Sequence, residues 1–160
     1  MAEKMLYIME EDKQAVVDRI SELEQEIQDL GPEFYDVFNQ SSETWHDNAP
    51  FDALRDRQSV LFAELQSLKT VLRNAELTLP KVNKRRVGIG AVVTIMDVDS
   101  KEEKVFFIAG DWTARTGKVT EGATIISTKA PLAEALLGKK EGDTVIFRQR
   151  YFIRSIEYQL

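Results

Sequence analysis

Apolar side chains recur in residues 16–37 at steps that alternate between four and three positions. The series consists of Val16, Ile20, Leu23, Ile27, Leu30, Phe34 and Val37. Such spacing over three heptads is typical of a helix that packs along one seam against a partner helix. The pattern therefore predicts a long amphipathic helix in the first quarter of the chain.

A second series with the same spacing follows in residues 51–72. Its members are Phe51, Leu54, Leu61, Leu65, Leu68 and Leu72, and the polar Gln58 stands where one more apolar residue is expected. Between the two series lies the segment NQSSETWHDNAP, which has no period and is rich in residues that form turns and helix caps. The sequence thus predicts two helices joined by a turn.

The numbering of the two series also predicts how the helices pair. In an antiparallel hairpin the numbers of facing residues have a nearly constant sum, and Leu30 with Leu61 gives 91, while other facing pairs give 91 or 92. Half of that sum places the turn between Trp45 and His46. With roughly 30 residues per helix at about 1.5 Å each, the hairpin is expected to extend ~40–45 Å.

Gly31 and Pro32 fall inside the first predicted helix. Proline has no backbone N–H to donate, and its ring crowds the preceding turn of a helix. A local bend or a break is therefore expected at this point, in preference to a straight rod.

The second half of the chain has a different pattern. The stretch LTLPKVNKRR contains Pro80, is polar and basic, and is typical of a linker. After it, runs rich in β-branched and aromatic residues predict five strands: Ala91–Met96, Val105–Ala109, Thr124–Thr128, Thr144–Arg148 and Phe152–Glu157. A short helix, Pro131–Leu137, is expected before Gly138. The fold class is α+β, with a coiled-coil hairpin in residues 1–78 and a small β-sheet domain in residues 79–160.

Composition and charge refine this picture. Residues 1–80 hold 7 Lys/Arg and 17 Asp/Glu, whereas residues 81–160 hold 14 and 10, so the halves have opposite net charge. This asymmetry favours two units in different surroundings, although solvated helices are often acidic. The absence of cysteine excludes disulfides and thiolate metal sites, and a single histidine argues against a His-based metal site or a Ser-His-Asp triad.

The same data bear on location. The absence of cysteine fits a reducing cytoplasm. No apolar run approaches the roughly 20 residues needed to cross a bilayer, so no membrane association is expected. The N-terminus lacks the small-residue cleavage site of a secretory signal.

Acidic residues gather at the predicted turn, whose tip lies near residues 43–50. The acids are Glu43, Asp47 and Asp52. Thr44, Trp45 and His46 lie between Glu43 and Asp47, and Asn48 follows Asp47. Carboxylates at the end of an arm can share Mg²⁺ with a partner's carboxylates, since this ion takes one or two protein oxygens together with water or phosphate. Two such ions about 4 Å apart promote phosphodiester hydrolysis.

A structural interpretation of the turn competes with the chemical one. Asp47 and Asn48 are suited to cap the second helix, and Asp52 in its first turn favours the positive end of the helix dipole. Arg55 and Arg57 either contact nucleic acid or a partner, or balance the acids one turn away. An exposed Trp45 favours contact with a partner, because a turn offers it no core.

On several of its motifs the sequence resembles the bacterial GreA/GreB transcript-cleavage factors. Residues 126–143, ISTKAPLAEALLGKKEGD, are similar to the family's pattern of a strand ending in Ile-Ser, then Ser-Pro, an apolar residue, Ala, a basic residue and a Leu-rich turn into Gly-Lys. Residues 87–111, VGIGAVVTIMDVDSKEEKVFFIAGD, are similar to the two strands that open the family's C-terminal domain. The order of hairpin, linker and domain agrees as well, and the resemblance implies an FKBP-like C-terminal domain.

The resemblance implies a monomeric transcription elongation factor that binds bacterial RNA polymerase. Its C-terminal domain is expected to dock at the rim of the polymerase secondary channel through Pro131, Leu132, Glu134 and Leu137. The hairpin then enters the channel, and Asp47 with Glu43 helps to hold a second Mg²⁺ jointly with the polymerase, which cleaves backtracked RNA. The factor has no catalytic residue and no cofactor of its own, and it meets the nascent RNA 3′ end only indirectly.

The chain departs from the family pattern at both functional ends. Asp47 stands where the family has Glu, and Thr44 stands where the family has its essential Asp, so Glu43 is the neighbouring substitute. In the docking region, Ala130 replaces a common Ser, and Glu134 occupies a position that is usually basic.

Two alternatives to cleavage stimulation therefore stay open. One is a channel-binding regulator or inhibitor of the same architecture that does not stimulate cleavage efficiently. The other, suggested by an FKBP-like domain, is a peptidyl-prolyl isomerase or chaperone module. The second has less support, because an isomerase pocket needs aromatic residues that strand packing is expected to use here.

Overall fold

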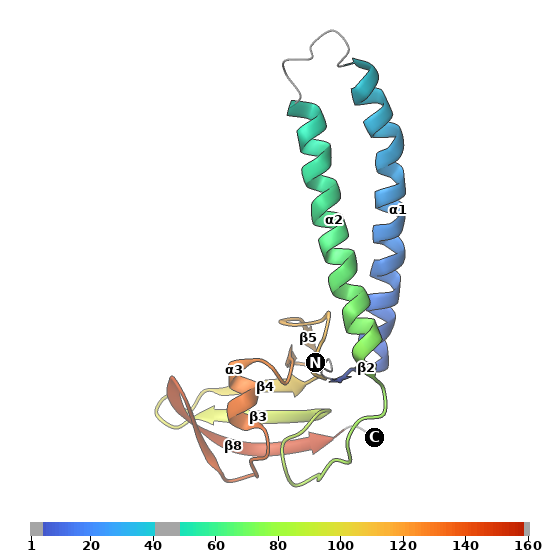
Figure 1. Ribbon diagram of the computed structural model, residues 1–160. Coiled ribbons are helices and arrows are strands. Elements are labelled where there is room, and N and C mark those ends of the chain that lie inside the picture. Colours follow the sequence, from blue (N-terminus) through green and yellow to red (C-terminus); the bar gives the residue numbers. More distant parts are fainter. Residues whose placement is uncertain (1–4, 41–48, 159–160) are drawn as a thin grey trace. The chain divides into compact units, whose positions relative to one another are not determined.

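The computed structural model describes residues 5–40 and 49–158 of the 160-residue chain (Figure 1). Within them, residues 5–13 and 74–158 form one compact unit, the sheet unit, and residues 14–40 and 49–73 form a second, the helical unit. The N-terminal residues lie in the sheet unit because β1 (Leu6–Tyr7) pairs in parallel with β2 (Ala75–Glu76). The predicted division between residues 78 and 79 stays a prediction.

The helical unit consists of α1 (Glu10–Gln40), whose first turn belongs to the sheet unit, and α2 (Ala49–Asn74) (Figure 1). Its core has four buried leucines, Leu23, Leu30, Leu61 and Leu65, and five partly buried side chains around them, Ile20, Ile27, Phe34, Leu54 and Leu68. All nine come from the two series found in the sequence, so the structure confirms the predicted seam. The Phe34 and Phe51 rings extend it with an edge-to-face contact at 5.6 Å.

The helix α1 runs without interruption through Gly31 and Pro32, so a break at this point is wrong, while the alternative of a local bend stays a prediction. Proline removes only one helical donor. Leu30 on one side of it is buried, and Phe34 on the other packs against the same core. Packing on both sides of the proline therefore holds the helix together, because tertiary contacts supply most of a helix's stability.

The sheet unit is built on a six-stranded sheet in the order β5-β6-β4-β3-β8-β7. The strands are β3 (Ala91–Asp97), β4 (Glu103–Ile108), β5 (Val119–Thr120), β6 (Ala123–Ile126), β7 (Thr144–Phe147) and β8 (Gln149–Tyr158). All neighbouring strands are antiparallel except β4 and β6, which are parallel. The five predicted strands are confirmed, while the two-residue strands β1, β2 and β5 were too short to leave a pattern.

One face of this sheet packs beneath the short helix α3 (Pro131–Leu136), which confirms the predicted helix. Alternate residues of β3 point into the core, as the strict alternation of buried and half-buried positions shows. From α3, Ala133 and Leu136 are fully buried against them. The predicted α+β fold class is thereby confirmed. Over the described ranges, no helix has the length and apolar character that a membrane span requires.

Candidate functional site

Most residues of the predicted acidic tip lie outside the described residues. These are Glu43, Thr44, Trp45, His46, Asp47 and Asn48, together with the predicted turn position between Trp45 and His46. Asp52 lies in the first turn of α2 and is exposed, as the helix-dipole interpretation predicts. Arg55 is exposed on the same helix. Arg57 lies 3.6 Å from Glu33 of α1, so it pairs across the hairpin and not with an acid on its own helix.

The predicted docking residues come together on α3 and the residue after it. Pro131 and Glu134 are exposed, whereas Leu132 and Leu137 are half-buried and pack against the core of the sheet unit. This division follows from the helical period, since residues three apart share a face. The outward surface of α3 thus presents Pro131 and Glu134, with the edges of the two leucines beside them.

The start and end of α3 explain why the helix is short. Ala130 precedes it with extended backbone angles, φ −65° and ψ 139°, and provides no side-chain hydrogen bond to the helix start. Pro131 occupies the first position, where a missing N–H does no harm. At the other end, Gly138 adopts a φ of 79° and donates to the carbonyl of Val87 at 2.9 Å. Arg86 donates back to the Gly138 carbonyl at 2.7 Å.

A second structural feature fixes the first turn of α1 within the sheet unit. The Asp12 carboxylate is fully buried and accepts hydrogen bonds from the Arg115 guanidinium, with Nε and Nη2 each at 3.0 Å. It also accepts from Thr113 Oγ1 at 2.9 Å and from the Ala114 backbone N–H at 3.2 Å. Arg115 reaches Glu11 as well, at 3.0 Å. The bidentate hydrogen bonding to Asp12 raises the pKa of Arg115 above its ordinary value.

The strand β1 is held by a complementary set of contacts. Tyr7 donates its N–H to Asp111 Oδ2 at 2.9 Å, and the Asp111 N–H donates to the Tyr7 carbonyl at 2.7 Å. Thr128 donates its hydroxyl to the other oxygen of Asp111. Gly110 makes this approach possible, because a Cβ on residue 110 would lie 2.3 Å from the Tyr7 carbonyl oxygen. Residues far apart in the sequence therefore meet in one closely packed region.

Sequence reasoning missed Asp12, Arg115 and Asp111. Asp12 lies in the first turn of a helix, where acids are common for reasons of the helix dipole alone. Its partner is 103 positions away. Neither residue type nor spacing indicated the pair.

The described residues contain no group of three or more His, Cys, Asp or Glu arranged to hold a metal ion. The predicted metal ligands Glu43 and Asp47 lie outside those residues, so their role stays a prediction.

These features define the class of the protein: an α+β protein that joins an antiparallel helical hairpin to a small mixed-sheet domain with one short helix. Residues 82–158 match the family model described as "Transcription elongation factor, GreA/GreB, C-term". This match and the curated relatives confirm the resemblance to the GreA/GreB family seen in the sequence.

Curated relatives and solved structures share this similarity. The chain is 39% identical over 100 residues to the transcription elongation factor GreA of Brucella anthropi and 38% identical over 100 residues to that of Brucella canis. Each match covers 62% of this chain and 60% of the relative, so the chain spans about 60% of the length of these relatives. The structure of GreA factor homolog 1 of Thermus thermophilus shares 18% identity, with 96% of this chain and 99% of that chain covered and a TM-score of 0.40.

Proposed function

We propose that this chain is a Gre-like transcription elongation factor that binds the RNA polymerase secondary channel and stimulates cleavage of backtracked nascent RNA. The observation that carries the proposal is the family's C-terminal domain at residues 82–158, with its short helix α3 exposed on one side. In this proposal the factor acts in the cytoplasm as a monomer, and the bacterial polymerase is its partner.

The docking step rests on the outward side of α3. Pro131 is rigid and exposed, and the half-buried Leu132 and Leu137 leave part of their apolar surface beside it. An apolar anchor with a charged residue at its rim, here Glu134, is the usual composition of a protein interface. The remainder of α3 is held by the core, so little ordering is needed on binding.

The helical unit supplies the arm. Its seam of packed leucines holds α1 and α2 together, and the acidic residues Glu43 and Asp47 follow in the sequence between the described ends at Gln40 and Ala49. Carboxylates are the ligands that Mg²⁺ prefers, so these residue types fit a metal shared with the polymerase. The chain's own role would be to place carboxylates, while bond cleavage belongs to the polymerase.

A second candidate function is a channel-binding regulator or inhibitor without efficient cleavage stimulation. It is favoured by Thr44, which stands where the family has an acid and has no carboxylate to offer. Isomerase activity is not proposed. Tyr151 is part of the sheet unit's core, and Phe106 and Phe147 pack against it, so these aromatics do not line an open cleft.

RNA cleavage in stalled elongation complexes tests the proposal. Purified polymerase with the wild-type chain should shorten backtracked RNA faster than polymerase alone, and Asp47→Asn and Glu43→Gln should each abolish most of that gain. Asp36→Asn, an exposed acid on α1, serves as the matched control and should leave the rate unchanged. Wild-type binding without any acceleration would favour the regulator, and no binding to polymerase would refute both functions.

A further inference from the structure

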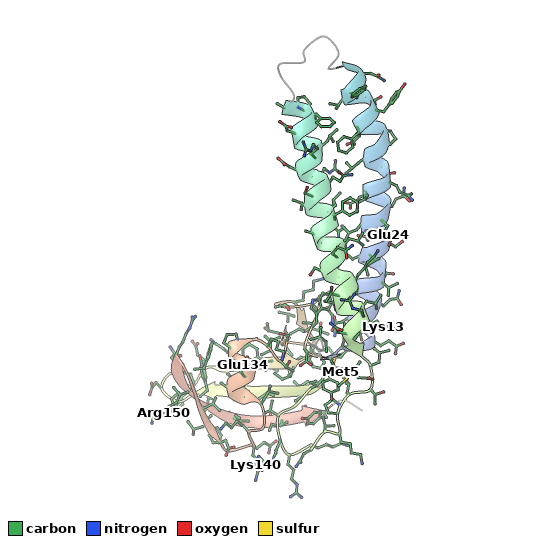
Figure 2. The ribbon with its side chains drawn as sticks, viewed as in Figure 1. Met5, Lys13, Glu24, Glu134, Lys140 and Arg150 are labelled. Atoms are coloured by element: carbon green, nitrogen blue, oxygen red, sulfur yellow. The ribbon has the colours of Figure 1, made fainter. Side chains whose placement is uncertain are left out.

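An exposed surface surrounds the tight turn between β7 and β8. We call it the Arg148 surface; its residues are Val98, Asp99, Ile146, Arg148, Gln149 and Arg150, and they line a shallow hollow of about 450 Å³. It belongs to the sheet unit, at the end where Arg150 and, on α3, Glu134 both lie (Figure 2). None of these six residues belongs to α3.

The first unusual feature of this surface is Ile146. Its side chain is 76% exposed, although it sits within a four-residue strand at the edge of the sheet. Over the described ranges, no strand pairs with β7 on the side away from β8. Proteins usually protect such an edge with charged residues or proline, because an exposed apolar edge invites association. A large apolar side chain here therefore indicates a contact surface.

The second feature is the charge around Ile146. Arg150 is its direct cross-strand partner, so both side chains lie on the same face of the sheet. Arg148 follows one residue beyond Phe147, with its guanidinium 5.7 Å from the centre of that ring. Neither arginine forms an ion pair in the part of the chain that the structure describes. The single acid, Asp99, leaves the surface with a net positive charge.

The third feature is the backbone of Arg148, which has a φ of 63°. Glycine adopts this left-handed conformation freely, whereas a residue with a side chain is strained in it. An arginine in a position suited to glycine is consistent with a functional demand for its charge. The contact with Phe147 accounts for the placement of the guanidinium but does not require an arginine at a glycine position.

We infer that the Arg148 surface is a second docking surface, with Ile146 as its apolar anchor and Arg148 and Arg150 as its cations. Its occupant is an acidic protein surface that has an apolar recess. A nucleic acid fits less well, because an exposed isoleucine finds no counterpart along a phosphate backbone and Asp99 would repel it. The inference rests on the proposed function, in that the partner is RNA polymerase.

Binding of the full-length chain to purified bacterial core RNA polymerase tests this inference. Ile146→Ser should weaken binding about tenfold, the usual effect of losing one buried aliphatic anchor. Arg150→Gln should weaken it about three- to tenfold, and that effect should shrink between about 0.05 M and about 0.3 M salt, since screening weakens charge pairs at the rim of an interface. Arg148→Gly should also weaken binding while thermal stability stays equal or rises, which separates lost docking from misfolding.

The opposite edge of the sheet provides a matched control. Val119 on β5 is 66% exposed, and Lys118 beside it is exposed too. Val119→Ser and Lys118→Gln should bind polymerase within about twofold of wild type, the scatter expected for residues outside an interface.

The outcomes separate the two proposals. If the wild type binds polymerase and the three Arg148-surface variants bind equally well, the inference is wrong and the proposed function stands. If the wild type does not bind, both fail. If the wild type is a dimer in sedimentation and Ile146→Ser makes it a monomer, the surface serves a second copy of the chain, which also overturns the inference.

Discussion

Replacing Arg115 by methionine removes the guanidinium that pairs with Asp12 and keeps much of the side chain's apolar length. Asp12 would stay fully buried with the two hydrogen bonds from Thr113 and Ala114, and it would lose the two from Arg115. Removing one partner of a buried ion pair destabilises a protein by about 3–5 kcal/mol, because the remaining charge is uncompensated. The Arg115 side chain is 22% exposed, so solvent screens part of the field and we expect about 3 kcal/mol.

Urea unfolding of the sheet unit measures this loss. Trp112 lies three positions before Arg115 and reports on the region by fluorescence, in a Trp45→Phe background that removes the other tryptophan. The matched control is Arg154→Met, which breaks the pair between Arg154 and Glu103, whose side chains are 60% and 43% exposed. Such an exposed pair contributes about 0–1 kcal/mol.

A double-mutant cycle with Asp12→Asn completes the test. The single Asp12→Asn substitution should cost about 1–2 kcal/mol, because it weakens hydrogen bonds but leaves no buried carboxylate. The double variant should be more stable than the sum of the two single losses predicts, by about 1 kcal/mol or more. The reasoning is refuted if Arg115→Met destabilises the sheet unit no more than Arg154→Met does.

Other single contacts give three more expected outcomes. Gly110→Ala should destabilise the sheet unit by about 3 kcal/mol or prevent β1 from docking, since its Cβ would meet the Tyr7 carbonyl at 2.3 Å; amide hydrogen exchange of residues 5–8 would report the loss. Ala130→Ser should stabilise it by about 0.5–1 kcal/mol in thermal or urea unfolding, because the extended residue before α3 has no side chain to cap the helix. The hydrogen bond from Arg19 lowers the pKa of Glu64, so the stabilisation by this pair is present above pH about 4.5 and is lost as the pH falls through the lowered pKa. Glu64→Gln should therefore reduce the loss of thermal stability that α1 and α2 show as the pH falls, by less than about 1 kcal/mol. An unchanged loss in this variant would contradict a stabilising pair between Arg19 and Glu64.

The helical unit was largely predictable because its information is local. Heptad spacing sets which residues face the seam, so the spacing alone was enough to place Leu30 and Leu61 in one core. The break considered at Pro32 gave a local backbone preference more weight than the packing of its neighbours. Tertiary contacts override such preferences when residues on both sides pack against a core.

The sheet unit was predictable in its elements but not in its connections. Alternation and turn residues located the strands, since side chains of a strand point to opposite faces in turn. They carried no information about β1, which has two residues, or about the ion pair between Asp12 and Arg115. Contacts between residues about 100 positions apart depend on the topology of the whole unit, and a single sequence does not reveal it.

Glu134 on α3, which departs from the family pattern, bears on the charge that surrounds the Arg148 surface. Glu134 is exposed on α3 at a position where the family resemblance leads one to expect a basic residue, so this helix carries a negative charge on its outer side. The helix α3 packs against β7, the strand that carries Ile146 and leads into Arg148. Arg148 and Arg150 thus supply positive charge at the same end of the sheet unit, from a different element. Suppose that one partner contacts both α3 and the Arg148 surface. Glu134→Lys should then strengthen binding if the partner is acidic opposite both, and weaken binding if the partner places a cation opposite α3. The sign of the change in affinity therefore shows how charge is distributed on the partner.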